Sequence, residues 1–191
     1  MHRALCAIKA VGFDLDGTLY FQTPTMQDAV SVKAIEAAIG LARSLDGKKE
    51  KERFLRERKK ATGSWSKVFL EIGIKNPTQV LTRAIATADI VSLIKKDEKL
   101  AKIVGSLSRK YFLFIVSGSL RTIALKKLEK IGIDPHLFSY TFFGDDPNFT
   151  SRTEPENFKH FLTHSKYAPE EHVFIGDNPF TDVSIPNSLG M

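Results

Sequence analysis

The sequence predicts an α/β fold, with a Rossmann-like parallel sheet flanked by helices and a helical segment inserted after the first strand. Short apolar runs of strand length alternate with segments of helical periodicity over much of the chain. This alternation is typical of a parallel sheet built from strand–helix units. Residues 20–95, in contrast, show helical patterns without a clear strand. Apolar residues make up 42% and charged residues 26%, an ordinary globular composition that excludes a disordered or fibrous chain.

Four short, mostly apolar runs are the expected strands of the sheet. They are residues 7–13, 111–116, 140–143 and 172–176. Such runs fit strands that are buried on both faces of a parallel sheet. Elsewhere we expect helices, including one over residues 78–94 and one that stops at Gly132, because glycine is favoured just after a helix C-terminus.

Polar residues follow three of these strands at the point where each strand ends. They are Asp14 and Asp16 after the first strand, Ser117 and Gly118 after the second, and Asp177 and Asp182 after the fourth. In an open α/β sheet, ligands bind at the carboxyl ends of the strands, so these residues should meet at one edge. Carboxylates gathered in this way would repel one another without a cation. Magnesium, which prefers carboxylate, water and phosphate oxygens, is the expected cofactor.

The turn that follows the first strand would place two carboxylates over the same site. Gly17 lets the chain turn sharply, so Asp14 and Asp16 need not point to opposite faces of the sheet. A carboxylate held beside a magnesium ion can attack phosphorus and form an aspartyl phosphate. A second carboxyl group can protonate the leaving alcohol and then activate water. The motif therefore predicts phosphoryl transfer.

Three motifs in this order resemble those of the haloacid dehalogenase superfamily. Phe13–Thr18 is similar to its first motif, Ile115–Ser117 to its second and Gly176–Asp182 to its fourth, and the resemblance covers nearly the whole chain. The resemblance implies these roles: nucleophile and metal ligand for Asp14, general acid/base and backbone-carbonyl metal ligand for Asp16, phosphoryl binding for Ser117 and the Gly118 backbone, metal ligation for Asp177, and support of the metal or its waters for Asp182. Family members that act on carbon–halogen bonds lack the second aspartate, so Asp16 favours phosphoryl transfer over dehalogenation.

The third motif departs from the family pattern, which usually supplies a lysine just before a helix. Here Arg152 stands at the matching position. Arginine is always charged and can grip phosphate with two donors, so it can serve the same electrostatic purpose. Lys159 is the alternative. We favour Arg152 because a phosphate site should lie near a helix N-terminus, while an exposed loop arginine without a role stays a competing interpretation.

Residues 20–95 resemble the small helical cap that many members of the superfamily insert after the first motif. The predicted organisation is therefore an α/β core of residues 1–19 and 96–191, with a helical cap of residues 20–95. Such caps close over the site and select the substrate. The superfamily usually continues into a fifth strand after the fourth motif, so the last strand of the sheet is expected to be missing here.

The formal net charge of +6 is concentrated in residues 48–60, which hold eight basic and three acidic residues. Because runs of mixed sign are usually solvated helix faces, we do not expect nucleic acid as a partner. Cys6 is the only cysteine, so no internal disulfide can form and a reducing, cytoplasmic location is expected. No apolar run approaches the roughly 20 residues that span a bilayer, so no membrane partner is expected either.

The predicted function is magnesium-dependent hydrolysis of a small phosphate monoester, a sugar phosphate or a nucleotide, through an aspartyl-phosphate intermediate. Two alternatives stay open. A phosphomutase on the same scaffold would hand the phosphoryl group back to its substrate. A non-catalytic module would bind phosphate in the same pocket, or nucleic acid on the basic helix, without turnover.

Overall fold

The computed structural model describes residues 8–41, 48–150 and 152–191. They form two compact units, one made of the chain up to Gln22 together with Val91–Met191, the other of Thr23–Ile90. These boundaries lie a few residues inside the predicted insertion of residues 20–95. Cys6 and Ala7, the first residue of a predicted strand, lie outside the described residues.

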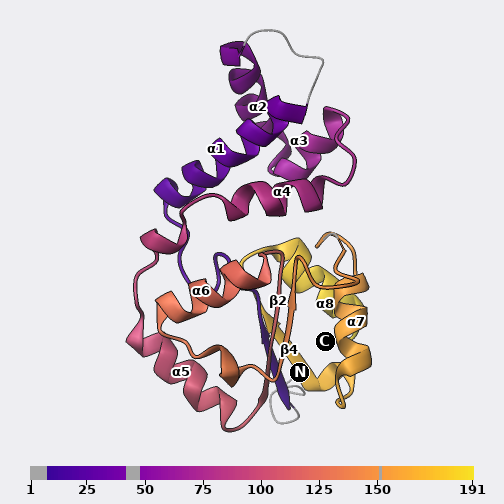
Figure 1. Cartoon of the computed structure of the whole chain (residues 1–191). Helices are drawn as coiled ribbons and strands as arrows, with labels where there is room; N and C mark the ends of the chain where they lie inside the picture. Colours follow the sequence, from indigo (N-terminus) through magenta and orange to yellow (C-terminus); the bar gives the residue numbers. More distant parts are fainter. Residues whose placement is uncertain (1–7, 42–47, 151) are drawn as a thin grey trace. The chain divides into compact units, whose positions relative to one another are not determined.

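Among the described residues, the first unit contains a four-stranded sheet in which every pair of neighbouring strands is parallel (Figure 1). The strands are β1 (Ala10–Phe13), β2 (Phe112–Ser117), β3 (Tyr140–Phe143) and β4 (His172–Ile175), in the order β3-β2-β1-β4. Phe13 lies opposite both Ile115 and Ile175, so β1, β2 and β4 reach the same edge of the sheet together. The predicted α/β fold with a parallel sheet is therefore confirmed.

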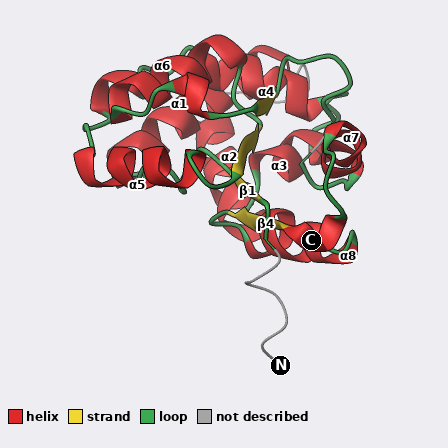
Figure 2. Cartoon of the chain, turned by 90° about the horizontal axis from the view of Figure 1, so that it is seen from below, coloured by secondary structure: helices red, strands yellow, loops and turns green. Residues whose placement is uncertain are grey.

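Helices cover both faces of this sheet, with α5 and α6 on one side and α7 on the other (Figure 1). The helices of the unit are α5 (Glu98–Ser108), α6 (Arg121–Ile131), α7 (Glu156–His164) and α8 (Ile185–Ser188), with short turns η1 (Val91–Leu93), η2 (Pro135–Leu137), η3 (Pro169–Glu171) and η4 (Pro179–Ser184). Figure 2 distinguishes the helices (red) from the strands (yellow) and the loops (green) of the described chain. Gly132 ends α6 as predicted, with φ of 96°, and its N–H donates to the carbonyl groups of Leu128 and Glu129.

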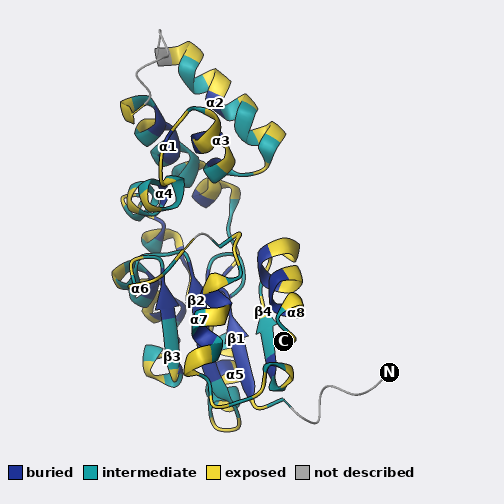
Figure 3. Ribbon diagram, turned by 90° about the vertical axis from the view of Figure 1, so that its right-hand side faces the viewer, coloured by how far each residue is buried: buried dark blue, intermediate teal, exposed yellow. Residues whose placement is uncertain are grey.

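The two central strands form the core of the first unit and are coloured as buried in Figure 3. Phe114 on β2 stacks on Phe161 of α7, with ring centroids 3.9 Å apart. Gly12 on β1 makes room for this stack, because a Cβ atom at that position would overlap the ring of Phe114. Successive residues of a strand point to opposite faces, so Leu113 and Ile115, both fully buried, fill the other face.

One edge of the sheet is formed by β4. Among the described residues β4 pairs with β1 alone, and no fifth strand follows it. The chain instead continues into the π-helical turn η4 and then α8.

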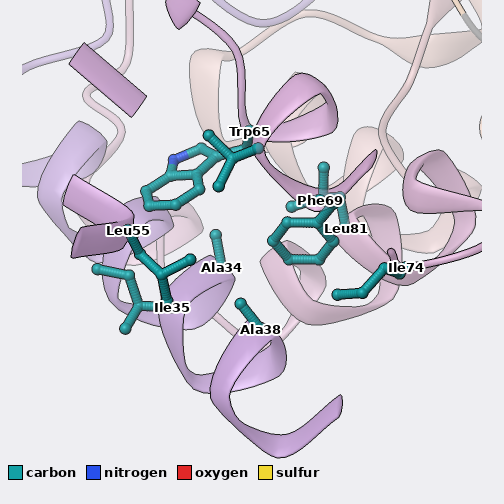
Figure 4. Packing of buried hydrophobic residues seen from close by; sticks show 9 residues of the cluster. Ala34, Ile35, Ala38, Leu55, Trp65, Phe69, Ile74 and Leu81 are labelled. Atoms are coloured by element: carbon teal, nitrogen blue, oxygen red, sulfur yellow. The ribbon is translucent and has the colours of Figure 1, made fainter. Parts of the chain in front are cut away.

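Over the residues that the structure describes, the second unit has four helices. Their buried apolar side chains form a core of their own (Figure 4). The helices are α1 (Pro24–Leu41), α2 (Lys48–Thr62), α3 (Trp65–Glu71) and α4 (Pro77–Ala86). The helix expected over residues 78–94 is shorter than predicted. It ends at Ala86, and the hydroxyl of the next residue, Thr87, donates to the carbonyl group of Ala84 at 2.7 Å. A side chain that bonds to nearby backbone in this way competes with continuation of the helix.

Several basic side chains of α2 pair with acidic residues within the same unit. Arg53 pairs with Glu57 at 3.0 Å, and Arg56 pairs with Glu52 at 3.0 Å. Arg58 pairs with Glu71 of α3 at 2.7 Å. In the described part of this segment the charge is thus partly neutralised, as it is on a solvated helix face.

Phe69 is the largest fully buried side chain of the second unit, so we expect its truncation to unfold that unit most readily. Phe69→Ala should lower the free energy of unfolding by about 3–5 kcal/mol, because it leaves a cavity at the centre of the cluster. The neighbouring Leu70 is 61% exposed, and Leu70→Ala should change it by less than about 0.5 kcal/mol. Urea unfolding followed by circular dichroism makes the comparison. Equal effects of the two variants would contradict this description of the core.

Candidate active site

Asp14, the first residue after β1, is a buried carboxylate at the carboxyl edge of the sheet. Its backbone N–H donates to the carbonyl group of Ile175 at 2.9 Å, which extends the ladder between β1 and β4 by one residue. Only 1% of Asp14 is exposed. Its Oδ1 atom accepts a hydrogen bond from Nη1 of Arg152 at 2.9 Å. The predicted nucleophile and the predicted third-motif residue are therefore in direct contact.

The guanidinium of Arg152 joins two acidic residues that lie far apart in the sequence. Its second terminal nitrogen, Nη2, pairs with Oδ1 of Asp182. The aliphatic part of Arg152 passes Gly118, where a Cβ atom would lie 3.5 Å from its Cδ. Lys159, the alternative residue, instead pairs with Glu156 at 3.2 Å on the exposed side of α7. Of the two candidates for the third-motif residue, Arg152 is therefore the one that contacts Asp14.

Asp14, Asp177 and Asp182 form a cluster in which one carboxylate oxygen from each lies within 4.8 Å of the others. Two glycines permit this approach. Gly17 has φ of 90°, and a Cβ atom there would overlap the carboxylate of Asp177. A Cβ atom at Gly176 would overlap Asp182. An all-oxygen donor set of this kind fits a magnesium ion.

Asp182 is held in place by its own loop. It is almost fully buried, and its Oδ1 atom accepts from the hydroxyl of Thr181 at 2.8 Å. Its Oδ2 atom accepts from the backbone N–H of Asn178 at 3.0 Å. Asp177, in contrast, lies on the exposed side of the cluster. The cluster around Asp14 therefore contains one carboxylate held by hydrogen bonds, that of Asp182, and one exposed carboxylate, that of Asp177.

The carboxylate of Asp16 has a separate set of donors, which includes the predicted Ser117. Its Oδ2 atom accepts from the hydroxyl of Ser119 at 2.7 Å and from that of Ser117 at 3.4 Å. Its Oδ1 atom accepts from the hydroxyl of Tyr20 at 2.5 Å and from Nζ of Lys127. Burial alone would raise the pKa of Asp16, but the ammonium of Lys127 and the hydrogen bonds from Lys127, Tyr20 and Ser119 hold it below its usual value.

Comparison with known proteins identifies the family to which this fold belongs. The family model for haloacid dehalogenase-like hydrolases matches residues 8–190. The chain belongs to this family. It is therefore a member of the haloacid dehalogenase (HAD) family of hydrolases and has the α/β core of that family. A search of curated proteins gives no significant match.

Solved structures of HAD proteins share the fold of this chain at low sequence identity. A haloacid dehalogenase-like hydrolase from Streptococcus pneumoniae is 21% identical, with a TM-score of 0.66, over 98% of this chain and 83% of the other. A HAD phosphatase from Thermococcus onnurineus is 22% identical, with a TM-score of 0.61, over 96% and 84%. A HAD hydrolase from Bacillus subtilis, solved with bound magnesium, is 17% identical, with a TM-score of 0.56, over 96% and 86%. Structures named as haloacid dehalogenases also match.

Three polar residues of the HAD site were not predicted from the sequence: Tyr20, Ser119 and Lys127. Lys127 had a detectable signal, because it lies at helical spacing from Ala124 and Ile131 on the apolar stripe of α6. A lysine on such a stripe must reach a buried partner. Tyr20 and Ser119 had no comparable signal, since hydroxyl side chains are common in connections between elements.

None of the helices that the structure describes is long and apolar enough to cross a membrane.

Burial raises the pKa of Asp14 from its ordinary value of 3.8 to about 7. The guanidinium of Arg152 opposes this shift, and the charges of Asp16 and Asp182 reinforce it. Folding of the metal-free protein thus favours protonated Asp14. This contribution to the free energy of unfolding is fully present below pH 3.8 and is lost as the pH rises through about 7.

A cation that binds ionised Asp14 should reverse this loss. We expect magnesium to raise the melting temperature more at about pH 8 than at about pH 5, because a protonated carboxyl group does not ligate the ion. Differential scanning fluorimetry over this range tests the expectation. Asp177→Asn, which removes one carboxylate of the cluster, should reduce the magnesium effect at both pH values. A magnesium effect that does not vary with pH would contradict a ligand role for Asp14.

Proposed function

We propose that the protein is a magnesium-dependent phosphatase that hydrolyses a small phosphate monoester through an aspartyl phosphate at Asp14. One observation carries the proposal: Asp14 is buried at the end of β1, in contact with Arg152 and within the cluster formed with Asp177 and Asp182. A buried carboxylate beside a fixed positive charge is suited to attack on an anionic phosphoryl group. Asp16 supplies a second carboxyl group two residues away.

The reaction takes place in two displacements at phosphorus. In the first, a carboxylate oxygen of Asp14 bonds to phosphorus, the bond to the ester oxygen breaks, and that oxygen takes a proton from the protonated form of Asp16, which is the minor form because the pKa of Asp16 is lowered. In the second, Asp16 takes a proton from water, the water oxygen bonds to phosphorus, and the bond to Asp14 breaks. The products are one alcohol and one inorganic phosphate, and both aspartates return to their starting states.

The remaining residues of the site bind the phosphoryl group and hold the cation. Arg152 would contact phosphoryl oxygens, with the hydroxyl of Ser117 and the backbone N–H of Gly118 as further donors. Asp14, Asp177 and the backbone carbonyl of Asp16 would hold magnesium, with Asp182 supporting the ion or its waters. When bound, the ion offsets negative charge on the transferring group.

Asp16 is the residue that favours phosphate esters over organic halides as substrates. A carbon–halogen bond releases a halide, which needs no proton, whereas an alcohol leaving from a phosphate ester needs one. The resemblance of the fold to a named HAD phosphatase supports this choice. We further propose that the helical insertion, residues 20–95, acts as a cap that selects a phosphorylated metabolite such as a sugar phosphate or a nucleotide.

A panel of phosphate esters, assayed with and without magnesium, tests the proposed function. We expect release of inorganic phosphate from at least one sugar phosphate or nucleotide, and loss of that activity in the presence of a chelator. A phosphomutase would instead give an isomer of the substrate with little free phosphate. Release of halide from a 2-haloacid, without phosphate release from any ester, would overturn the proposal.

A further inference from the structure

The side chain of Lys127 projects from the middle of α6 into the site and has no role in the mechanism described above. The residue is 2% exposed and belongs to the buried stripe of the helix, with Ala124, Leu128 and Ile131. Burial of an ammonium group is unfavourable unless it is paired and hydrogen-bonded. Its presence on this stripe therefore calls for a specific partner in the interior.

The partner of Lys127 is the carboxylate of Asp16. Nζ of Lys127 pairs with Oδ1 of Asp16 and donates a second hydrogen bond to the hydroxyl of Ser119 at 2.8 Å. That hydroxyl in turn donates to the other oxygen of Asp16, Oδ2, at 2.7 Å. Lys127 thus acts on both carboxylate oxygens, on one directly and on the other through Ser119.

The aromatic ring of Tyr20 completes this enclosure. Nζ of Lys127 lies 5.8 Å from the centroid of the ring, within the range of a cation–π contact. The hydroxyl of Tyr20 donates to the same oxygen of Asp16 that Lys127 contacts, at 2.5 Å. Two groups converge on Oδ1 of Asp16 and two hydroxyls on Oδ2, so rotation of the carboxylate would break several hydrogen bonds.

We propose that Lys127 is a positioning residue, which fixes the carboxyl group of Asp16 in the orientation needed for proton transfer to the leaving group and from water. This inference rests on the proposed phosphatase function. Positioning by a charged group on a rigid helix is more effective than positioning by loop residues, because the helix restricts the movement of the side chain. Each of the two basic side chains thus pairs with one catalytic carboxylate: Arg152 with the nucleophile Asp14, and Lys127 with the general acid/base Asp16.

Leaving-group dependence tests the inference, since only proton transfer depends on how basic the leaving oxygen is. The probes are p-nitrophenyl phosphate, whose leaving group departs without a proton, and benzyl phosphate, whose leaving alkoxide requires one. Lys127→Met keeps the length and apolar body of the side chain but removes the ammonium. Lys126→Met, one residue earlier on the exposed side of α6, is the matched control.

We expect Lys127→Met to slow the first step about 10²-fold with benzyl phosphate, and about tenfold or less with p-nitrophenyl phosphate, with little change in substrate affinity. The second step still needs Asp16 as a base, so p-nitrophenyl phosphate should give a burst of one nitrophenol per active site. Lys126→Met should match the wild type on both esters. Ser119→Ala, which removes the second contact of Lys127, should show the same leaving-group pattern with a smaller loss.

Three results are decisive. Equal slowing of both esters without a burst would show a merely structural role for Lys127 and would overturn the inference while leaving the phosphatase proposal intact. Absence of phosphate release by the wild type from either ester and from the wider panel would overturn both. Should Lys127→Met not fold, as judged by circular dichroism, Ser119→Ala decides, and wild-type ratios for the two esters would again overturn the inference.

Discussion

Asp14→Asn should lower the rate of phosphate release by about 10⁴-fold or more, because the amide lacks the charge and the nucleophilicity that formation of the aspartyl phosphate requires. Steady-state release of inorganic phosphate, measured with the best ester of the panel and saturating magnesium, gives the ratio. The loss should appear in kcat, since Arg152 still binds the phosphoryl group.

Asp134→Asn is the matched control for that variant. Asp134 is exposed and precedes η2 and β3, at the opposite end of the sheet from the site. Asparagine can still accept the hydrogen bond that Asp134 receives from the backbone N–H of His136. We expect activity close to that of the wild type. Retention of activity by Asp14→Asn would remove the covalent mechanism.

The second largest effect is expected from Arg152→Met, which should reduce kcat/KM by roughly 10²–10³-fold. The variant removes the positive charge that faces the transferring group and leaves the carboxylates of Asp14 and Asp182 without their shared partner. Loss of one partner from a buried ion pair is also destabilising, so the melting temperature should fall. Kinetic assays and thermal unfolding of the same preparation measure both effects.

Two further substitutions test whether the charge or the two-sided contact of Arg152 matters, and whether Lys159 takes its place. Arg152→Lys keeps the charge, but a single ammonium cannot reproduce the two-sided contact with Asp14 and Asp182, so an intermediate loss is expected. Lys159→Met should have little effect, because Lys159 pairs with Glu156 on an exposed helix surface. A large loss with Lys159→Met and a small one with Arg152→Met would assign the third-motif role to Lys159.

The sequence predicted those parts of the site that depend on local signals. Asp14, Ser117 and Asp177 each lie at or just after the end of an apolar run, and parallel strands bring such ends to one edge regardless of side-chain packing. Arg152 could be favoured as the phosphate-binding residue because it lies just before a predicted helix. Gly17 could be identified as a turn residue, although its second purpose, space for the carboxylate of Asp177, depends on the fold.

Contacts that depend on how elements pack could not be predicted in the same way. Lys127 lies 111 residues from Asp16, and their pairing depends on the distance and rotation of α6 relative to the sheet. The requirement for glycine at position 12 follows from the ring of Phe114 on the neighbouring strand. Periodicity alone extended one helix to residue 94, whereas α4 ends at Ala86; the hydrogen bond from the Thr87 hydroxyl to the carbonyl group of Ala84 leaves no mark on the pattern of apolar residues.

Identification of the residue that becomes phosphorylated is the most direct test of covalent catalysis by Asp14. The wild type would be mixed with magnesium and the best ester of the panel, quenched in acid within one turnover, reduced with borohydride and mapped by mass spectrometry. Borohydride converts an aspartyl phosphate to homoserine, so we expect homoserine at position 14, and only in samples that contain substrate. Phosphate release without modification of Asp14, or modification of a different residue, would contradict it.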